Sequence, residues 1–258
     1  MNGLIFGLCA LFGVAGTAHA LREVWRQRRR TEYRIARIAR IVAASASTVG
    51  ASFAIPAVAG MIESAIGMDN VAKLAAHVCF VVACGSIQLM LVDWSYTSEA
   101  LTASLYARIA LGLCVLAAMI TLFVASTDES IEFTMQYAAV PDVAAYYLAY
   151  LAYVAITCCE ITYLCSGMAV SAQRSGHVLS ARGLGMSAAS AILGIAFTAS
   201  KGSYLVTRYL GRPWSLRAEE IVSPMLGGLA LITFTTGLIL AMAGRRVPPE
   251  KVSASALA

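Results

Sequence analysis

Long hydrophobic runs separated by short polar connections dominate the pattern of this chain. The runs cover residues 2–21, 38–64, 71–93, 107–126, 143–169, 184–210 and 223–244. Each is close to the roughly 20 apolar residues that a helix needs to cross a bilayer. The pattern therefore predicts an all-α membrane protein, in which residues 1–246 form a bundle of seven transmembrane helices. The tail 247–258, with prolines and small residues, is predicted to be disordered and cytoplasmic.

Composition supports the membrane assignment. The 258 residues are 59% hydrophobic and only 13% charged, whereas a soluble domain carries about 25% charged residues. All seven cysteines fall inside the predicted spans and none has CxxC spacing. They are therefore expected to pack as small hydrophobic side chains.

The second run is the longest and contains Pro56. A proline removes one helical hydrogen bond, so a kink is predicted there. The stretch AASASTVGASFAIPAVAG, residues 43–60, is rich in small residues. Small side chains let helix backbones approach closely in lipid, so this stretch is expected to pack against another helix.

Positive charge is distributed unevenly between the connections. The segment from Arg22 to Arg40 holds eight arginines, and one side of the predicted membrane carries 14 of the 19 basic residues. The opposite side has an acidic loop with Asp128, Glu129, Glu132 and Asp142. The positive-inside rule then predicts an N-terminus outside and a C-terminus in the cytoplasm, in the inner (plasma) membrane.

Two details of the first segment have alternative interpretations. Ala18-His19-Ala20 resembles a signal-peptide cleavage site, but no positive charge precedes the run, which favours an uncleaved first helix. The arginines of residues 22–40 are interpreted first as a topology signal and second as a site for anionic lipid headgroups. Because topology explains the excess positive charge, no nucleic-acid partner is predicted.

Three predicted helices each carry one stripe of polar residues. Such stripes normally face the bundle interior or a water-filled cavity, because lipid cannot satisfy them. The third span has Lys73, His77, Cys84 and Gln88; the fifth has Tyr146, Tyr150, Tyr153, Thr157 and Glu160; the sixth has Ser187, Ser190, Gly194, Thr198, Lys201, Tyr204 and Arg208.

Lys201 and Glu160 are the residues of these stripes whose charge is most costly to place inside the membrane. Helical rise places Lys201 in the outer half of the membrane and Glu160 in the inner half, roughly 12–14 Å apart along the normal, so no salt bridge between them is expected. Lys201 is predicted to be solvated in an outward-opening polar cleft with His77 and tyrosines, or else to snorkel to the headgroups. Glu160 is predicted to be protonated or to meet a donor such as Gln88 or Tyr163.

GMDNVAKLAAH, residues 67–77, and LGIAFTASKGSYLVTRYLG, residues 193–211, resemble segments of actinobacterial seven-helix membrane proteins that are labelled as transporters. The resemblance implies a seven-span body and a role for Asn70, His77 and Lys201. Family members often have a proline before this asparagine, whereas Asp69 stands here. Longer members continue into a cytoplasmic domain, whereas this sequence stops soon after Arg246. The resemblance supplies no substrate.

The sequence contains no signature of an enzyme. HExxH, GxSxG, P-loop and dinucleotide motifs are absent, and the three histidines lie in three different segments. No catalytic, cofactor or metal site is therefore predicted. The candidate ligand-binding residues are Lys201, His77, Tyr204, Asn70, Tyr150 and Tyr153, and the candidate intramembrane network is Glu160, Gln88 and Tyr163.

Three functions fit these features. The first is sensor-like recognition of a small anionic ligand in the outer cleft, with helix shifts altering contacts to a membrane or cytoplasmic partner. The second is a secondary transporter or channel with Lys201 and Glu160 on its pathway. Transporters often have matching helix breaks in two repeats, and Pro56 has no counterpart here, which weakens this alternative. The third is a structural subunit of a membrane complex.

Cysteine labelling tests the predicted orientation. In a chain whose own cysteines are replaced, Thr31→Cys should resist a membrane-impermeant maleimide in intact cells and react after permeabilisation, because positive loops stay cytoplasmic. Ser130→Cys in the acidic loop is the control and should react in intact cells. Labelling of Thr31→Cys from outside would refute the orientation.

Overall fold

The computed structural model describes residues 2–26, 33–96, 98–126 and 140–244, and these are almost entirely helical. The predicted tail 247–258, most of the acidic loop and Arg28, Arg29 and Arg30 lie outside the described residues. The described helices are α1 (Asn2–Arg26), α2 (Arg34–Phe53), α3 (Pro56–Ile66), α4 (Val71–Ser95), α5 (Ser98–Ala125), α6 (Pro141–Arg174), α7 (Val178–Tyr209) and α8 (Leu216–Ala243).

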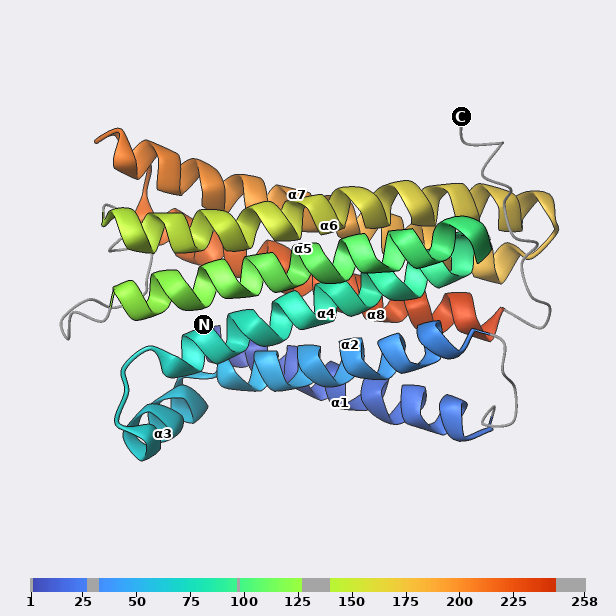
Figure 1. Ribbon diagram of the computed structural model, residues 1–258, viewed down its shortest axis with the longest axis horizontal. Coiled ribbons are helices and arrows are strands. Elements are labelled where there is room, and N and C mark those ends of the chain that lie inside the picture. Colours follow the sequence, from blue (N-terminus) through green and yellow to red (C-terminus); the bar gives the residue numbers. More distant parts are fainter. Residues whose placement is uncertain (1, 27–32, 97, 127–139, 245–258) are drawn as a thin grey trace.

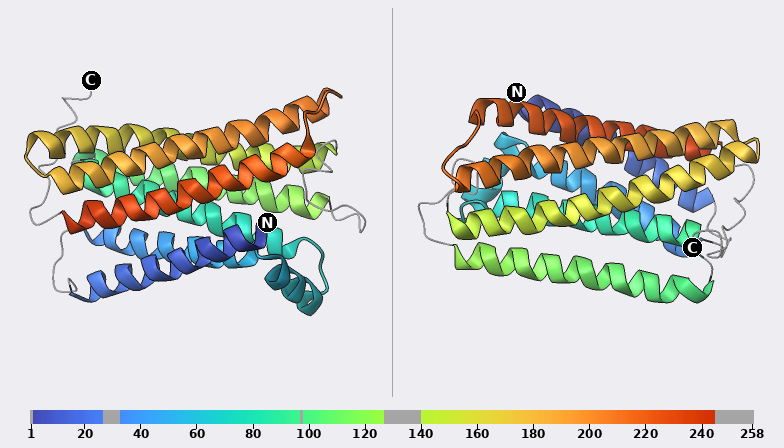
Figure 2. Two further views of the ribbon diagram at one scale, coloured as in Figure 1. Left: turned by 180° about the vertical axis from the view of Figure 1, so that it is seen from behind. Right: turned by 90° about the horizontal axis from the view of Figure 1, so that it is seen from above.

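The long helices lie side by side along one axis, and the short α3 packs across one end (Figures 1 and 2). The most extensive contacts join α7 to α8, α6 to α7, and α2 to α4. Helices α1, α4, α6 and α8 finish at the same end of the bundle, where α2, α5 and α7 begin (Figure 1). We call it the arginine end, because it carries Arg22, Arg26, Arg34, Arg37 and Arg174.

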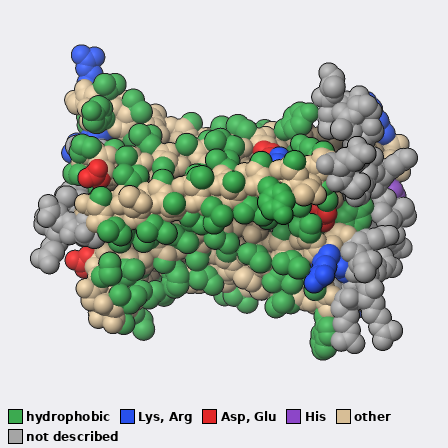
Figure 3. Space-filling view, in the orientation of Figure 1, with side chains coloured by type: hydrophobic (Ala, Val, Ile, Leu, Met, Phe, Trp, Pro, Cys, Tyr) green, Lys and Arg blue, Asp and Glu red, His purple; other side chains and the backbone are tan. Residues whose placement is uncertain are grey.

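The described helices have the length and hydropathy of a multi-pass membrane protein. Five qualify as membrane spans, namely α4, α5 from Ala100, α6, α7 and α8, and the bent pair α2 and α3 makes a sixth if it counts as one span. Hydrophobic side chains cover the middle of the face in Figure 3, and most charged side chains there lie toward the two ends. Because α1 is not among the qualifying helices of the described chain, seven spans and the orientation remain predictions.

The prediction of one helix over residues 38–64 is wrong. Helix α2 ends at Phe53, α3 begins at Pro56, and the two are bent by 84°. Ile55 is extended, with φ −76° and ψ 122°, the conformation favoured by a residue that precedes proline. Pro56 then occupies the first turn of α3, where its missing N–H costs nothing. The proline thus starts a new helix instead of kinking one.

A side chain from α4 caps the start of α2. The buried Asp93 accepts a hydrogen bond at Oδ2 from the backbone N–H of Ala36, at 3.0 Å. Tyr33, which precedes α2, provides no side-chain cap of its own. A carboxylate at this position satisfies a free N–H and interacts favourably with the helix dipole, so Asp93 ties α2 to α4.

Helices α7 and α8 approach closely through small residues. A Cβ atom on Gly183 would overlap the backbone of Ala241, and one on Gly237 would meet Ser187. The hydroxyl of Ser180 donates to the carbonyl of Ala241 at 3.1 Å. The small polar residues predicted to line a cleft on this helix therefore include a helix-packing surface, as is common in membranes.

This contact generates a prediction. Gly183→Ala should destabilise the protein by about 1–3 kcal/mol, because the added methyl meets backbone that cannot move aside easily. Gly185→Ala is the matched control, since its Cβ would meet nothing within 4 Å. Thermal unfolding in detergent measures both. Equal stability of the two variants would contradict the packing described.

Candidate functional site

Lys201 on α7 has an ion-pair partner on α8. Its Nζ lies 3.4 Å from Oε1 of Glu219, and the exposed fractions of the two side chains are 19% and 2%. The ammonium group also lies over the ring of Phe197, 5.7 Å from its centroid. A positive charge this far inside an apolar helix bundle is stable only with such partners. The Glu219 carboxylate supplies the opposite charge.

The sequence analysis did not identify Glu219, because it began the last span at residue 223. The structure begins α8 at Leu216, after Ser215, whose hydroxyl accepts a hydrogen bond from the backbone of Ala218 at 3.4 Å. Serine is a favoured N-cap residue, so it was the signal that could have moved the predicted start. The antiparallel turn from α7 into α8 then brings Glu219 beside Lys201.

A histidine and three tyrosines form a buried cluster between α4 and α6. Nδ1 of His77 and the hydroxyl of Tyr146 lie 2.9 Å apart, within hydrogen-bond distance. The His77 ring stacks on Tyr150 with centroids 4.5 Å apart, and it packs edge-to-face with Tyr147 with centroids 5.6 Å apart. All three tyrosines are buried. We call these four residues the His77 cluster.

The His77 cluster lies next to the Lys201 pair. Lys201 is close enough for its charge to act on His77, as is Lys73, and Glu219 acts in the same way on Tyr147. Lys73 also donates to Oδ1 of Asn70 at 3.1 Å. Charged and hydroxyl groups from α4, α6, α7 and α8 thus meet in this half of the bundle.

Two other predicted ligand residues have partners of their own. Tyr204 is buried and packs edge-on against Trp214, with ring centroids 5.7 Å apart. The hydroxyl of Tyr153 donates to Oε1 of Gln88 at 3.2 Å. Of the six candidates, His77 and Tyr150 are in contact, Lys201 lies within electrostatic range of His77, and Asn70 contacts Lys73.

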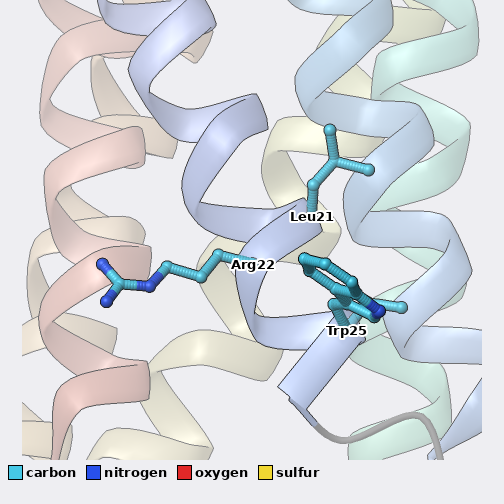
Figure 4. A pocket seen from close by; sticks show the side chains of 4 residues that line it. Leu21, Arg22 and Trp25 are labelled. Atoms are coloured by element: carbon cyan, nitrogen blue, oxygen red, sulfur yellow. The ribbon is translucent and has the colours of Figure 1, made fainter.

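The outward-opening cleft at Lys201 stays a prediction. A shallow hollow of about 620 Å³ lies on α1, lined by Leu21, Arg22, Val24 and Trp25. In Figure 4, Leu21 and Trp25 point to one side of α1 and Arg22 to the other. None of the predicted ligand residues lines this hollow.

A second polar network surrounds Glu160. Oε1 accepts from Nε of Arg108 at 2.8 Å and is also contacted by Nη2, and Oε2 accepts from Nε2 of Gln88 at 2.7 Å. Arg108 donates in addition to the carbonyl of Ser104 at 2.8 Å. We call Arg108, Glu160, Gln88 and Tyr153 the Glu160 network. Its charges balance, and its polar atoms have partners.

The Glu160 network corrects two details of the sequence analysis. Arg108 was one of the 14 basic residues assigned to the cytoplasmic side of the membrane, but α5 begins at Ser98 and carries Arg108 along the helix to Glu160. Tyr163 was a predicted donor to Glu160, but 58% of its surface is exposed, and Arg108 takes that role. Glu160 and Lys201 each have their own partner of opposite charge.

Among the described residues, no group of three or more His, Cys, Asp or Glu side chains could hold a metal ion. The chain matches no protein-family model, and neither a curated protein nor a solved structure is significantly similar to it. The site must therefore be interpreted from its own chemistry.

The Glu160 network generates a prediction about stability. Arg108→Met and Glu160→Gln should each destabilise the protein by about 2 kcal/mol or more, because each leaves a partly buried charge without its partner. The double variant should lose less than the sum of the two, since no unpaired charge remains. Thermal unfolding measures the cycle, with the exposed Arg182→Met as control. Strict additivity would show that the pair contributes nothing.

Proposed function

We propose that this multi-pass membrane protein recognises a small monovalent anion at the ammonium group of Lys201, in a sensor-like manner. The observation that carries the proposal is a partly exposed ammonium paired with one fully buried carboxylate. By the distribution of Lys and Arg, this half of the bundle faces outward. The fold implied by the actinobacterial resemblance and the plasma-membrane location are part of the same proposal.

The chemistry around Lys201 suits an anion. An ammonium group has three N–H donors, whereas Lys201 has one carboxylate oxygen at 3.4 Å and one aromatic face as neighbours. Charge-assisted hydrogen bonds to an anion are about twice as strong as neutral ones. Only 19% of the Lys201 side chain is exposed, so the proposed ligand is small.

Helix α8 is the element through which binding would be transmitted. Its first turn carries Glu219, and its last turns carry Met242, which contacts Arg40 of α2 near the arginine end. A ligand that binds the Lys201 ammonium would weaken its contact with Glu219, which is one of the contacts between the start of α8 and α7. A shift of α8 would then alter the contact with α2 at the opposite end.

One observation favours transport as a second candidate function. Polar side chains follow one another along α4 and α6 from the His77 cluster through Cys84, Tyr153 and Gln88 to Glu160. Such a column, with a charged pair near each end, resembles a pathway for protons or small ions. Under this alternative, Glu160→Gln would abolish uptake into proteoliposomes and leave binding at Lys201 intact.

Binding of simple anions to the purified protein in nanodiscs tests the proposed function. Acetate, nitrate or chloride should raise the unfolding temperature of the parent protein, and Lys201→Met should abolish the rise because it removes the positive charge while keeping the side-chain length. Arg217→Met is the control: Arg217 is an exposed residue at the same end of α8.

Two results would contradict the proposal. One is that none of the three anions stabilises the parent protein above the effect of an equal concentration of the neutral osmolyte sucrose. The other is that Lys201→Met and Arg217→Met respond to the anions equally.

A further inference from the structure

We propose that Glu219 is the resident anion of the Lys201 site, and that an incoming anion binds together with one proton, which Glu219 takes up. This inference rests on the proposed function and adds the condition under which the site becomes available. It assigns a role to a carboxylate that lies outside the polar stripes of the sequence.

The geometry shows that Glu219 is held mainly by charge. Its side chain is 2% exposed, and Oε1 lies 3.4 Å from Nζ of Lys201. Within the described part of the chain, this buried Oε1 accepts no hydrogen bond. A buried carboxylate oxygen normally has a hydrogen-bond donor. The oxygen therefore occupies the place of an anion beside Lys201 without a network that fixes it there.

Charge balance links the binding of an anion to a proton. Lys201 and Glu219 together are neutral, so an added monovalent anion would leave one uncompensated negative charge in an apolar surrounding, which is costly. One proton taken from bulk water onto the Glu219 carboxylate restores neutrality. The resulting carboxylic acid has an O–H group that can donate to the bound anion.

Other titratable or charged groups face this site. Tyr147 on α6 lies near Glu219, and His77 and Lys73 on α4 lie on the side of Lys201. Tyr147 is neutral in the physiological range of pH. His77 is the competing proton acceptor, although its Nδ1 already lies within hydrogen-bond distance of Tyr146. Among these groups, Glu219 is the one in direct contact with the Lys201 ammonium.

The pH dependence of affinity tests the inference. For the full chain in nanodiscs, measured from about pH 6 to about pH 9, the Kd for acetate, nitrate or chloride should rise with pH, by at most about tenfold per pH unit, because binding takes up one proton. Glu219→Gln should bind at high pH at least tenfold more tightly than the parent, with a Kd that varies less than about twofold over this range.

Three control variants make the result specific. Glu220→Gln changes the neighbouring, exposed carboxylate and should keep the parent's pH dependence. Glu219→Asp keeps a titrating group and should also keep it, which separates the loss of the proton from a general disturbance of α8. His77→Gln tests the competing acceptor: because His77 is a candidate ligand residue, the Kd itself can change, but its pH dependence should persist.

Each remaining outcome overturns a defined part of the proposal. A parent protein that binds the anions with a Kd independent of pH overturns the inference and leaves the proposed function intact. A pH dependence that survives in Glu219→Gln, or disappears in His77→Gln, overturns the assignment to Glu219. Absence of binding in the parent and in every variant overturns the proposed function and the inference together.

Discussion

A charge inside an apolar helix bundle needs a partner of opposite sign, and this constraint organises the interior of the protein. Two cations inside the described helices have one: Lys201 meets Glu219, and Arg108 meets Glu160. Both pairs join different helices, so they also determine which helices can be neighbours. Ion pairs of this kind contribute little net stability but strongly disfavour arrangements that leave one member alone. The pairing of α7 with α8 and of α5 with α6 follows this rule.

Contacts between glycine and serine residues hold α7 against α8 in addition to the ion pair. Helices α7 and α8 are held together by small residues at their arginine end, around Gly183 and Gly237, and by the Lys201 pair in the other half. The first kind of contact depends on shape, because an added methyl group would meet backbone. The second depends on the opposite charges of Lys201 and Glu219. The two ends of the helix pair are thus held by different kinds of interaction.

Helix class and the membrane assignment could be predicted from sequence, because both follow from the length of apolar runs. The hydrogen bond between Gln88 and Glu160 could also be predicted, since helical rise places both residues at a similar depth in the membrane. The partner of Lys201 could not, because the estimate of where α8 begins missed Glu219 by four residues. Arg108 was misassigned for the same reason: a residue near a helix boundary was counted as a loop charge. An error in a predicted helix end therefore matters most when a charged residue lies near that end, because its ion-pair partner is then missed.

The cap that Asp93 supplies to α2 has a consequence for biogenesis. Since α4 is synthesised after α2, the hydrogen bond from the N–H of Ala36 to Asp93 can form only after Asp93 has left the ribosome. The first turn of α2 therefore matures only when α4 arrives beside it. Insertion and docking are separate stages for membrane helices, and this hydrogen bond belongs to the second. Chains truncated between α2 and α4 would lack the acceptor for the N–H of Ala36.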